Sequence, residues 1–104
     1  MNYFNTKNFV ECLDEKVVDT YEDWIILGKY LHNINNNLNY LNLWIEKSKS
    51  SITYSYKYEN IDQVCNNIWN GMINNNNNNH NIHNYLKLKF MNKSIAPIGD
   101  ILIQ

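Results

Sequence analysis

Residues 20–32 read Thr-Tyr-Glu-Asp-Trp-Ile-Ile-Leu-Gly-Lys-Tyr-Leu-His, and they show the clearest helical pattern in the chain. Its apolar residues recur at the three- and four-residue spacing of one helical face, which contains Tyr21, Trp24, Leu27, Gly28 and Leu31. Thr20 precedes this face and Asp23 follows three residues later, an approximate capping box. Gly28 in the middle of a helix costs about 1 kcal/mol relative to alanine, so we expect a neighbouring helix to approach closely there.

Three further segments show helical spacing, and a fourth, residues 83–91, is a candidate helix with poor periodicity. The pattern predicts short helices over residues 8–16, 38–47, 60–72 and 83–91, besides the central helix, which should end near His32 or Asn33. Their clearest apolar residues are Phe9, Cys12, Leu13, Leu38, Leu41, Trp44, Ile45, Ile61, Val64, Cys65, Ile68, Trp69 and Met72. The fold class that follows is all-α, a small bundle of four to five short helices with Asn-rich loops.

The remaining segments divide the chain. Residues 1–7 are interpreted as an N-terminal arm, residues 8–92 as one helical domain, and residues 93–104 as a tail. The asparagine homopolymer predicts a disordered loop over residues 74–81. Residues 52–58 alternate as a strand would, but no second strand is evident, so we interpret them as an extended connector.

The formal net charge is close to zero, at −1. A dedicated nucleic-acid binder usually has a clear basic excess, so any DNA contact is expected to be local. All nine basic residues are lysines, and the abundance of Asn, Lys, Ile and Tyr is typical of an AT-rich genome.

Cysteine usage and hydropathy indicate the compartment. Cys12 and Cys65 form neither a disulfide framework nor a metal-ligand spacing, so we expect both thiols to be reduced and buried. No apolar run approaches the ~18 residues of a membrane span, and the N-terminus lacks a signal-peptide pattern. The protein is expected to be intracellular and cytoplasmic, without membrane contact.

Motifs for catalysis are absent. A P-loop needs Gly-Lys-Ser/Thr after a glycine-rich turn, whereas Gly28-Lys29 lies within a predicted helix and precedes Tyr30. His80 and His83 have a spacing that could grip a metal, but the asparagine run offers no rigid platform. We therefore interpret these two as solvated loop histidines.

The charged residues of the central helix have structural explanations. Glu22 and Asp23 at its N-terminus and His32 at its C-terminus all suit the helix dipole. Two-metal nucleotidyl transfer needs paired carboxylates in a sheet-based site, and no such pattern is visible. We predict no enzymatic activity, no catalytic residue, no metal, no cofactor and no small-molecule substrate.

The end of the third predicted helix is rich in hydrogen-bond donors: residues 47–51 read Lys-Ser-Lys-Ser-Ser, and Lys57 follows six residues later. Lysine and serine donate hydrogen bonds to phosphate oxygens without reading sequence. On the residues alone, a solvated helix terminus with a favourable dipole interaction is the better explanation. The tryptophans Trp24, Trp44 and Trp69 lie on apolar faces, and we expect them in the core rather than as platforms for base stacking.

Three motifs occur in one order along the chain. Residues 24–32 read Trp-x-x-x-Gly-x-x-Leu-His, residues 41–51 read Leu-x-Leu-Trp-x-x-x-Ser-x-x-Ser, and residues 68–72 read Ile-Trp-Asn-Gly-Met. Together they resemble the second type of primase C-terminal domain, as in poxvirus-type and giant-virus helicase-primases. The resemblance covers about residues 8–73. Beyond them the asparagine run interrupts the family pattern, and the family's terminal Trp-Ala is missing.

The resemblance implies a linker module of a viral DNA replication primase-helicase, whose partners would be single-stranded or template DNA and the primase or helicase. It implies scaffold roles for Trp24, Gly28, Leu31, Trp44 and Trp69. It also suggests an edge of the domain that binds nucleic acid, for which the candidate residues are Lys47, Ser48, Lys49, Ser51 and Lys57. The alternative, from another class, is a protein-interaction module or decayed fragment with no nucleic-acid role, whose apolar residues 101–103 dock on a partner.

Overall fold

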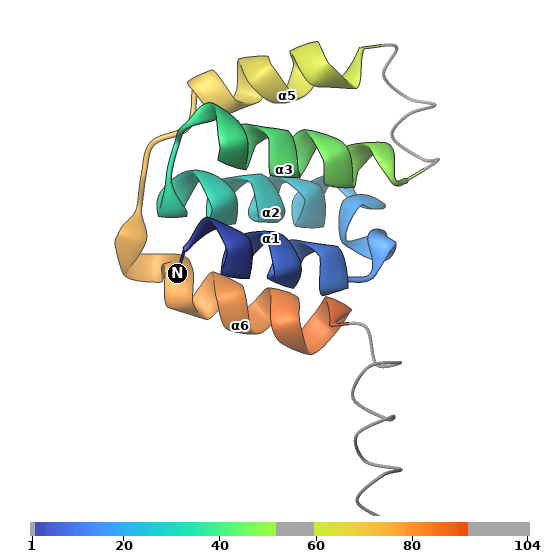
Figure 1. Ribbon diagram of the computed structural model, residues 1–104, viewed down its shortest axis with the longest axis vertical. Helices are drawn as coiled ribbons and strands as arrows, with labels where there is room; N and C mark the ends of the chain where they lie inside the picture. The colour runs from blue at the N-terminus through green and yellow to red at the C-terminus, as the bar shows by residue number, and fades with distance from the viewer. Residues whose placement is uncertain (1, 52–59, 92–104) are drawn as a thin grey trace, which may run out of the picture.

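The computed structural model describes residues 2–51 and 60–91, and these residues form an all-α bundle, as predicted. Figure 1 shows the helices stacked side by side with roughly aligned axes. Among the helices described, none is both long and apolar enough to cross a membrane. In chain order the elements are α1 (Tyr3–Cys12), the 3-10 turn η1 (Glu15–Val18), α2 (Tyr21–Ile34), α3 (Leu38–Lys49), α5 (Ile61–Asn70), the 3-10 turn η2 (Asn76–Asn78) and α6 (Asn79–Phe90).

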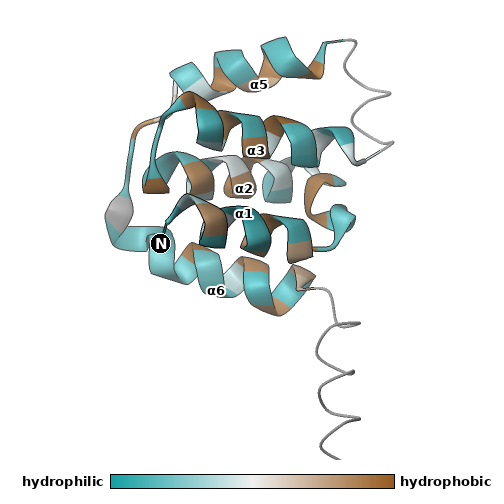
Figure 2. Ribbon diagram, in the orientation of Figure 1, coloured by the Kyte–Doolittle hydropathy of each residue, from teal (hydrophilic) through white to brown (hydrophobic). Residues whose placement is uncertain are grey.

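Helix α2 is central and begins where the sequence predicted. Thr20 Oγ1 accepts a hydrogen bond from the Asp23 amide at 3.3 Å and donates one to Asp23 Oδ2 at 3.2 Å. The helix packs against α3, α6 and η1. Figure 2 shows hydrophobic residues interleaved with hydrophilic ones along the ribbons, the pattern of helices that bury one face.

The three tryptophans share one interior, as expected. Trp24 and Trp44 are fully buried and their rings stack with centroids 5.0 Å apart, while the Trp69 ring lies 6.1 Å from that of Trp44. Each indole N–H has a hydrogen-bond acceptor. Trp44 donates to the Trp24 carbonyl, Trp69 to the Asn36 carbonyl, and Trp24 to the Ser48 hydroxyl. Leu31 is also fully buried. These residues and the close approach at Gly28 form the predicted scaffold.

Asparagine side chains begin three of the helices. Asn2 Oδ1 accepts from the Asn5 amide at 2.8 Å, Asn37 Oδ1 from the Asn39 amide at 3.0 Å, and Asn60 Oδ1 from the Gln63 amide at 3.2 Å. An N-cap residue of this kind satisfies one of the backbone donors that a helix start leaves open. The Asn-rich composition therefore supplies helix starts as well as loops.

The first helix begins earlier than the sequence suggested. It runs from Tyr3 to Cys12 rather than from about Asn8 to Lys16, so residues 3–7 are helical and the expected arm was wrong there. The physical reason is the Asn2 cap, after which Thr6 turns inward and is fully buried.

The asparagine run is more ordered than predicted. Residues 76–78 form η2, and α6 starts at Asn79 instead of His83. The Asn75 amide donates to Asn33 Oδ1 at 2.8 Å, and Asn79 Nδ2 donates to the Tyr30 carbonyl at 3.3 Å. Polar contacts with α2 thus hold this run in place, so the expectation of a disordered loop over residues 74–81 was wrong. The predicted connector at residues 52–58, with Lys57, and the tail at residues 93–104 lie outside the described residues.

Candidate functional site

Ser48 belongs to the core and not to an exposed edge. Its side chain is fully buried, accepts the hydrogen bond of Trp24 Nε1 at 2.7 Å and donates to the Trp44 carbonyl at 2.7 Å. The expectation that Ser48 faces nucleic acid is therefore wrong, because helix packing has placed its hydroxyl between two tryptophans.

Lys47 is half-buried and binds the backbone of another element. Its Nζ donates to the Leu13 carbonyl just after α1. Burial lowers the pKa of the Lys47 ammonium, and the nearby Asp14 and Glu15 carboxylates act in the opposite direction. Lys47 therefore ties α3 to the end of α1, and much of its donor capacity is directed into the protein.

Ser51 and Lys49 also have partners within the chain. Ser51 is 3% exposed and its hydroxyl donates to Asp19 Oδ1 at 2.8 Å. Lys49 is exposed and forms an ion pair with Asp62 at 2.8 Å, and the hydrogen bond to this carboxylate raises the Lys49 pKa. Burial of Ser51 contradicts its assignment as an exposed donor. Of the predicted edge residues that the structure describes, Lys49 alone is exposed, and its side chain is 44% exposed.

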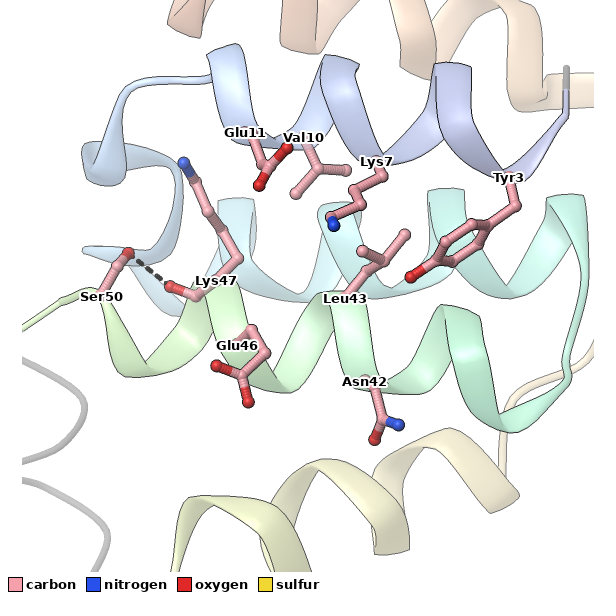
Figure 3. A pocket seen from close by; sticks show the side chains of 9 residues that line it. All are labelled: Tyr3, Lys7, Val10, Glu11, Asn42, Leu43, Glu46, Lys47 and Ser50. Atoms are coloured by element: carbon pink, nitrogen blue, oxygen red, sulfur yellow. Dashed lines mark hydrogen bonds between the residues drawn. The ribbon is translucent and has the colours of Figure 1, made fainter.

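A groove of about 600 Å³ runs between α1 and α3, beside this segment. Figure 3 shows Tyr3 and Lys7 reaching into it from α1, with Glu46 and Lys47 on α3. Glu11 lies near the Lys47 end of the groove. Its volume is in the range of ligand pockets, and its lining mixes both charge signs.

The surroundings of the groove are more acidic than basic. A neighbouring hollow of about 300 Å³ shares Lys47 with the groove and is lined by Asp14 and Glu15. Together the two hollows present four carboxylates (Glu11, Asp14, Glu15 and Glu46) and two ammonium groups (Lys7 and Lys47). A phosphodiester backbone would meet net repulsion there, because like charges raise its energy.

The histidines occupy helices and not a solvated loop. His83 lies on α6, stacks on the Phe9 ring with centroids 4.3 Å apart and has Nδ1 at 2.7 Å from the Tyr30 hydroxyl. The solvated-loop interpretation was wrong for His83, because α6 begins early enough to place it against α1 and α2. His80 is exposed on the same helix. Within residues 2–51 and 60–91, no cluster of three His, Cys, Asp or Glu side chains could hold a metal ion.

His32 and Asp23 are both buried near the ends of α2. The His32 ring packs edge-on against Trp69, and its Nδ1 has no hydrogen-bond partner among the described residues. Asp23 Oδ1 accepts from the Tyr85 hydroxyl at 2.6 Å, and Oδ2 lies 3.1 Å from Lys89 Nζ. The Asp23 carboxylate therefore fastens α6 to the start of α2.

The groove residues Tyr3, Lys7 and Glu11 were missed by the sequence analysis. The arm assignment hid Tyr3 and Lys7, although the Asn2 cap was a signal that a helix begins at Tyr3, and Glu11 lay in the predicted helix over residues 8–16 without being singled out. Tyr3 meets the Tyr40 ring of α3 edge-on with centroids 5.6 Å apart, a contact that no local pattern reveals.

Comparison with known protein families identifies the family of this chain. The family described as Primase C terminal 2 (PriCT-2) matches residues 6–81, which confirms the resemblance inferred from the three motifs. The matched range runs from α1 into α6 and contains the three tryptophans and Gly28. No curated protein and no solved structure shows a significant match to the chain.

Proposed function

Because this chain belongs to the primase C terminal 2 family, we propose that it is a non-catalytic accessory module of a viral DNA replication primase-helicase. In this proposal it acts by binding a protein partner of the replication machinery, the polymerising or the motor part, and template DNA is not its main ligand. We choose a protein partner over DNA because the side chains of the lysine–serine segment, residues 47–51, bind groups within the chain.

The charges around that segment support a protein partner. Lys47 bonds the Leu13 carbonyl, Lys49 pairs with Asp62, and both predicted serines are buried. Binding to nucleic-acid phosphates is favoured because lysine and arginine side chains replace the counterions condensed on the nucleic acid, which are released. Side chains already paired within the protein are less available for this. The α1/α3 groove and the neighbouring hollow, with four carboxylates and two lysines between them, are better suited to a protein surface that carries both signs of charge.

The test is a paired binding measurement. The full chain is titrated against the polymerising domain and against the helicase domain encoded by the same genome, and separately against labelled single-stranded DNA at low and moderate salt. We expect saturable binding to one of the protein domains that persists at moderate salt. We expect DNA binding, where measurable, to be unaffected by replacing Lys47 and Lys49.

The matched control replaces two exposed lysines on α2 and α6, Lys29→Gln with Lys87→Gln, and is compared with Lys47→Gln with Lys49→Gln. Tight DNA binding whose salt slope flattens in the second pair and not in the first would overturn the proposal in favour of template contact. Absence of binding to both protein domains would contradict the accessory role itself.

A further inference from the structure

An apolar groove of about 570 Å³ lies between α2 and the end of α5. Tyr21 and Ile25 line it from α2, and Ile68, Met72 and Ile73 line it from α5 and the residues that follow. Tyr21 is 54% exposed and Ile73 is 88% exposed. Large apolar side chains held in water within one hollow are typical of a binding surface.

The groove continues toward α6. A second hollow of about 220 Å³ is lined by Asn33, Asn78 and Ile82 and shares Lys29 and Ile73 with the first. The two hollows therefore form one surface along the outer side of α2, which we call the α2 groove. Its apolar members are Tyr21, Ile25, Ile68, Met72, Ile73 and Ile82.

Lys29 is the one charged residue in the lining of the α2 groove. Within the described parts of the chain, the ion pairs are Lys49 with Asp62 and Lys89 with Asp23, so no carboxylate there lies within 4 Å of Lys29 Nζ. This differs from the α1/α3 groove, where lysines and glutamates occur together. An occupant that complements the α2 groove would carry aliphatic side chains next to one carboxylate.

We propose that the occupant is the C-terminal segment of the same chain, Asp100-Ile101-Leu102-Ile103, with the Asp100 carboxylate at Lys29 and the three aliphatic side chains over the apolar lining. Asp100 and the residues after it lie outside the described residues, and their sequence has the required chemistry. Burial of aliphatic surface drives such docking at about 25 cal/mol per Å².

The connection is long enough for docking within one molecule. The Lys89 side chain near the end of α6 is bound to Asp23 at the start of α2. Lys29 is six residues further along α2, roughly 9 Å at the helical rise. The nine residues from Met91 to Asp100 can span up to roughly 30 Å when extended. The inference is independent of the proposed function, and docking of this segment would cover the α2 groove against other partners.

The experiment is methyl NMR of the full chain. In the variant Ile101→Asp with Ile103→Asp, the signals of Ile25, Ile68, Met72 and Ile73 should shift, while those of Leu43 in the α1/α3 groove should stay in place. Lys29→Gln and Asp100→Asn should each shift the same subset, and the double variant should shift it no further than either alone.

The matched control is Leu88→Asp, which adds a charge at a residue that is 83% exposed on α6 and outside the α2 groove lining. It should leave the groove signals unchanged. Unchanged groove signals in the tail variants would overturn the proposal. Shifts that depend on protein concentration would overturn it too, because the segment would then bind another copy.

Discussion

The indole ring of Trp44 lies against the backbone of Gly28, so that a Cβ built on Gly28 would stand 2.7 Å from both Cε2 and Cζ2 of that ring. The ring is fully buried and stacked on Trp24, and so it has no open side toward which it can retreat. This contact explains why a residue with poor helix propensity is in the middle of α2.

Gly28→Ala should lower the free energy of unfolding by about 1–3 kcal/mol, the usual cost of overpacking a core, despite the ~1 kcal/mol that alanine gains in helix propensity. Urea denaturation followed by tryptophan fluorescence measures the change. Gly71→Ala is the matched control, because a Cβ there would meet its nearest atom at 3.6 Å. Equal stability of the two variants would contradict the packing argument.

Ser48→Ala should lower the free energy of unfolding by about 1–3 kcal/mol, because it removes the acceptor of a buried indole N–H and leaves polar atoms in a dry interior. Thermal denaturation gives the measurement. Ser50→Ala is the control, since Ser50 is exposed and its hydroxyl donates to the Lys47 carbonyl next to solvent. A neutral Ser48→Ala would restore the view that this serine faces outward.

Tyr85→Phe should loosen α6 by about 1–2 kcal/mol, because it removes a 2.6 Å hydrogen bond to the Asp23 carboxylate, and bonds to charged groups are among the stronger ones. Hydrogen exchange should show that the variant speeds amide exchange in α6 more than in α3, relative to the unchanged protein. Leu88→Ala, on the same helix but 83% exposed, should leave exchange unchanged. Uniform loss of protection over all helices would argue against a local fastening.

Stability should fall as the pH drops below about 6.5 through the titration of His83. Burial, followed by the charges of Lys87 and His80, lowers the His83 pKa from its ordinary 6.5. The folded state therefore binds the proton less readily than the unfolded state, so the stabilisation is present above pH 6.5 and is lost as pH falls through the folded pKa.

The groups that face the His83 ring are Phe9 of α1 and the hydroxyl of Tyr30 on α2. Burial raises the Tyr30 pKa to about 12, so this hydroxyl stays protonated over the whole range, 2.7 Å from Nδ1 of the ring. Urea titrations at neutral and mildly acidic pH, on the protein and on His83→Gln, measure the effect. The variant should lose the pH dependence, whereas His80→Gln at an exposed position should retain it.

Much of the fold was predictable from local patterns. The 3.6-residue spacing and the Thr20–Asp23 cap gave α2 its start, and the same spacing placed Trp24, Trp44 and Trp69 inside. These features depend on residues within one or two helical turns of each other, which sequence displays directly. The start of α1 could have been found in the same way from the Asn2 cap.

The candidate site was less predictable, because it depends on which polar side chains are covered by other helices. Ser51 looks exposed after α3 and is buried against Asp19, 32 residues away. His83 appears to lie in an asparagine loop, but it stacks on Phe9 and bonds Tyr30, 53 residues away.

Spacing and capping act over a few residues, and they were enough to predict the helical class, the start of α2 and the burial of the three tryptophans. Tertiary packing, in contrast, turns the lysine–serine segment inward at Ser48 and gathers apolar side chains around Lys29 in the α2 groove. The physical reason is that burial and hydrogen bonding of polar groups depend on how distant helices pack, and helical periodicity carries no record of those distances.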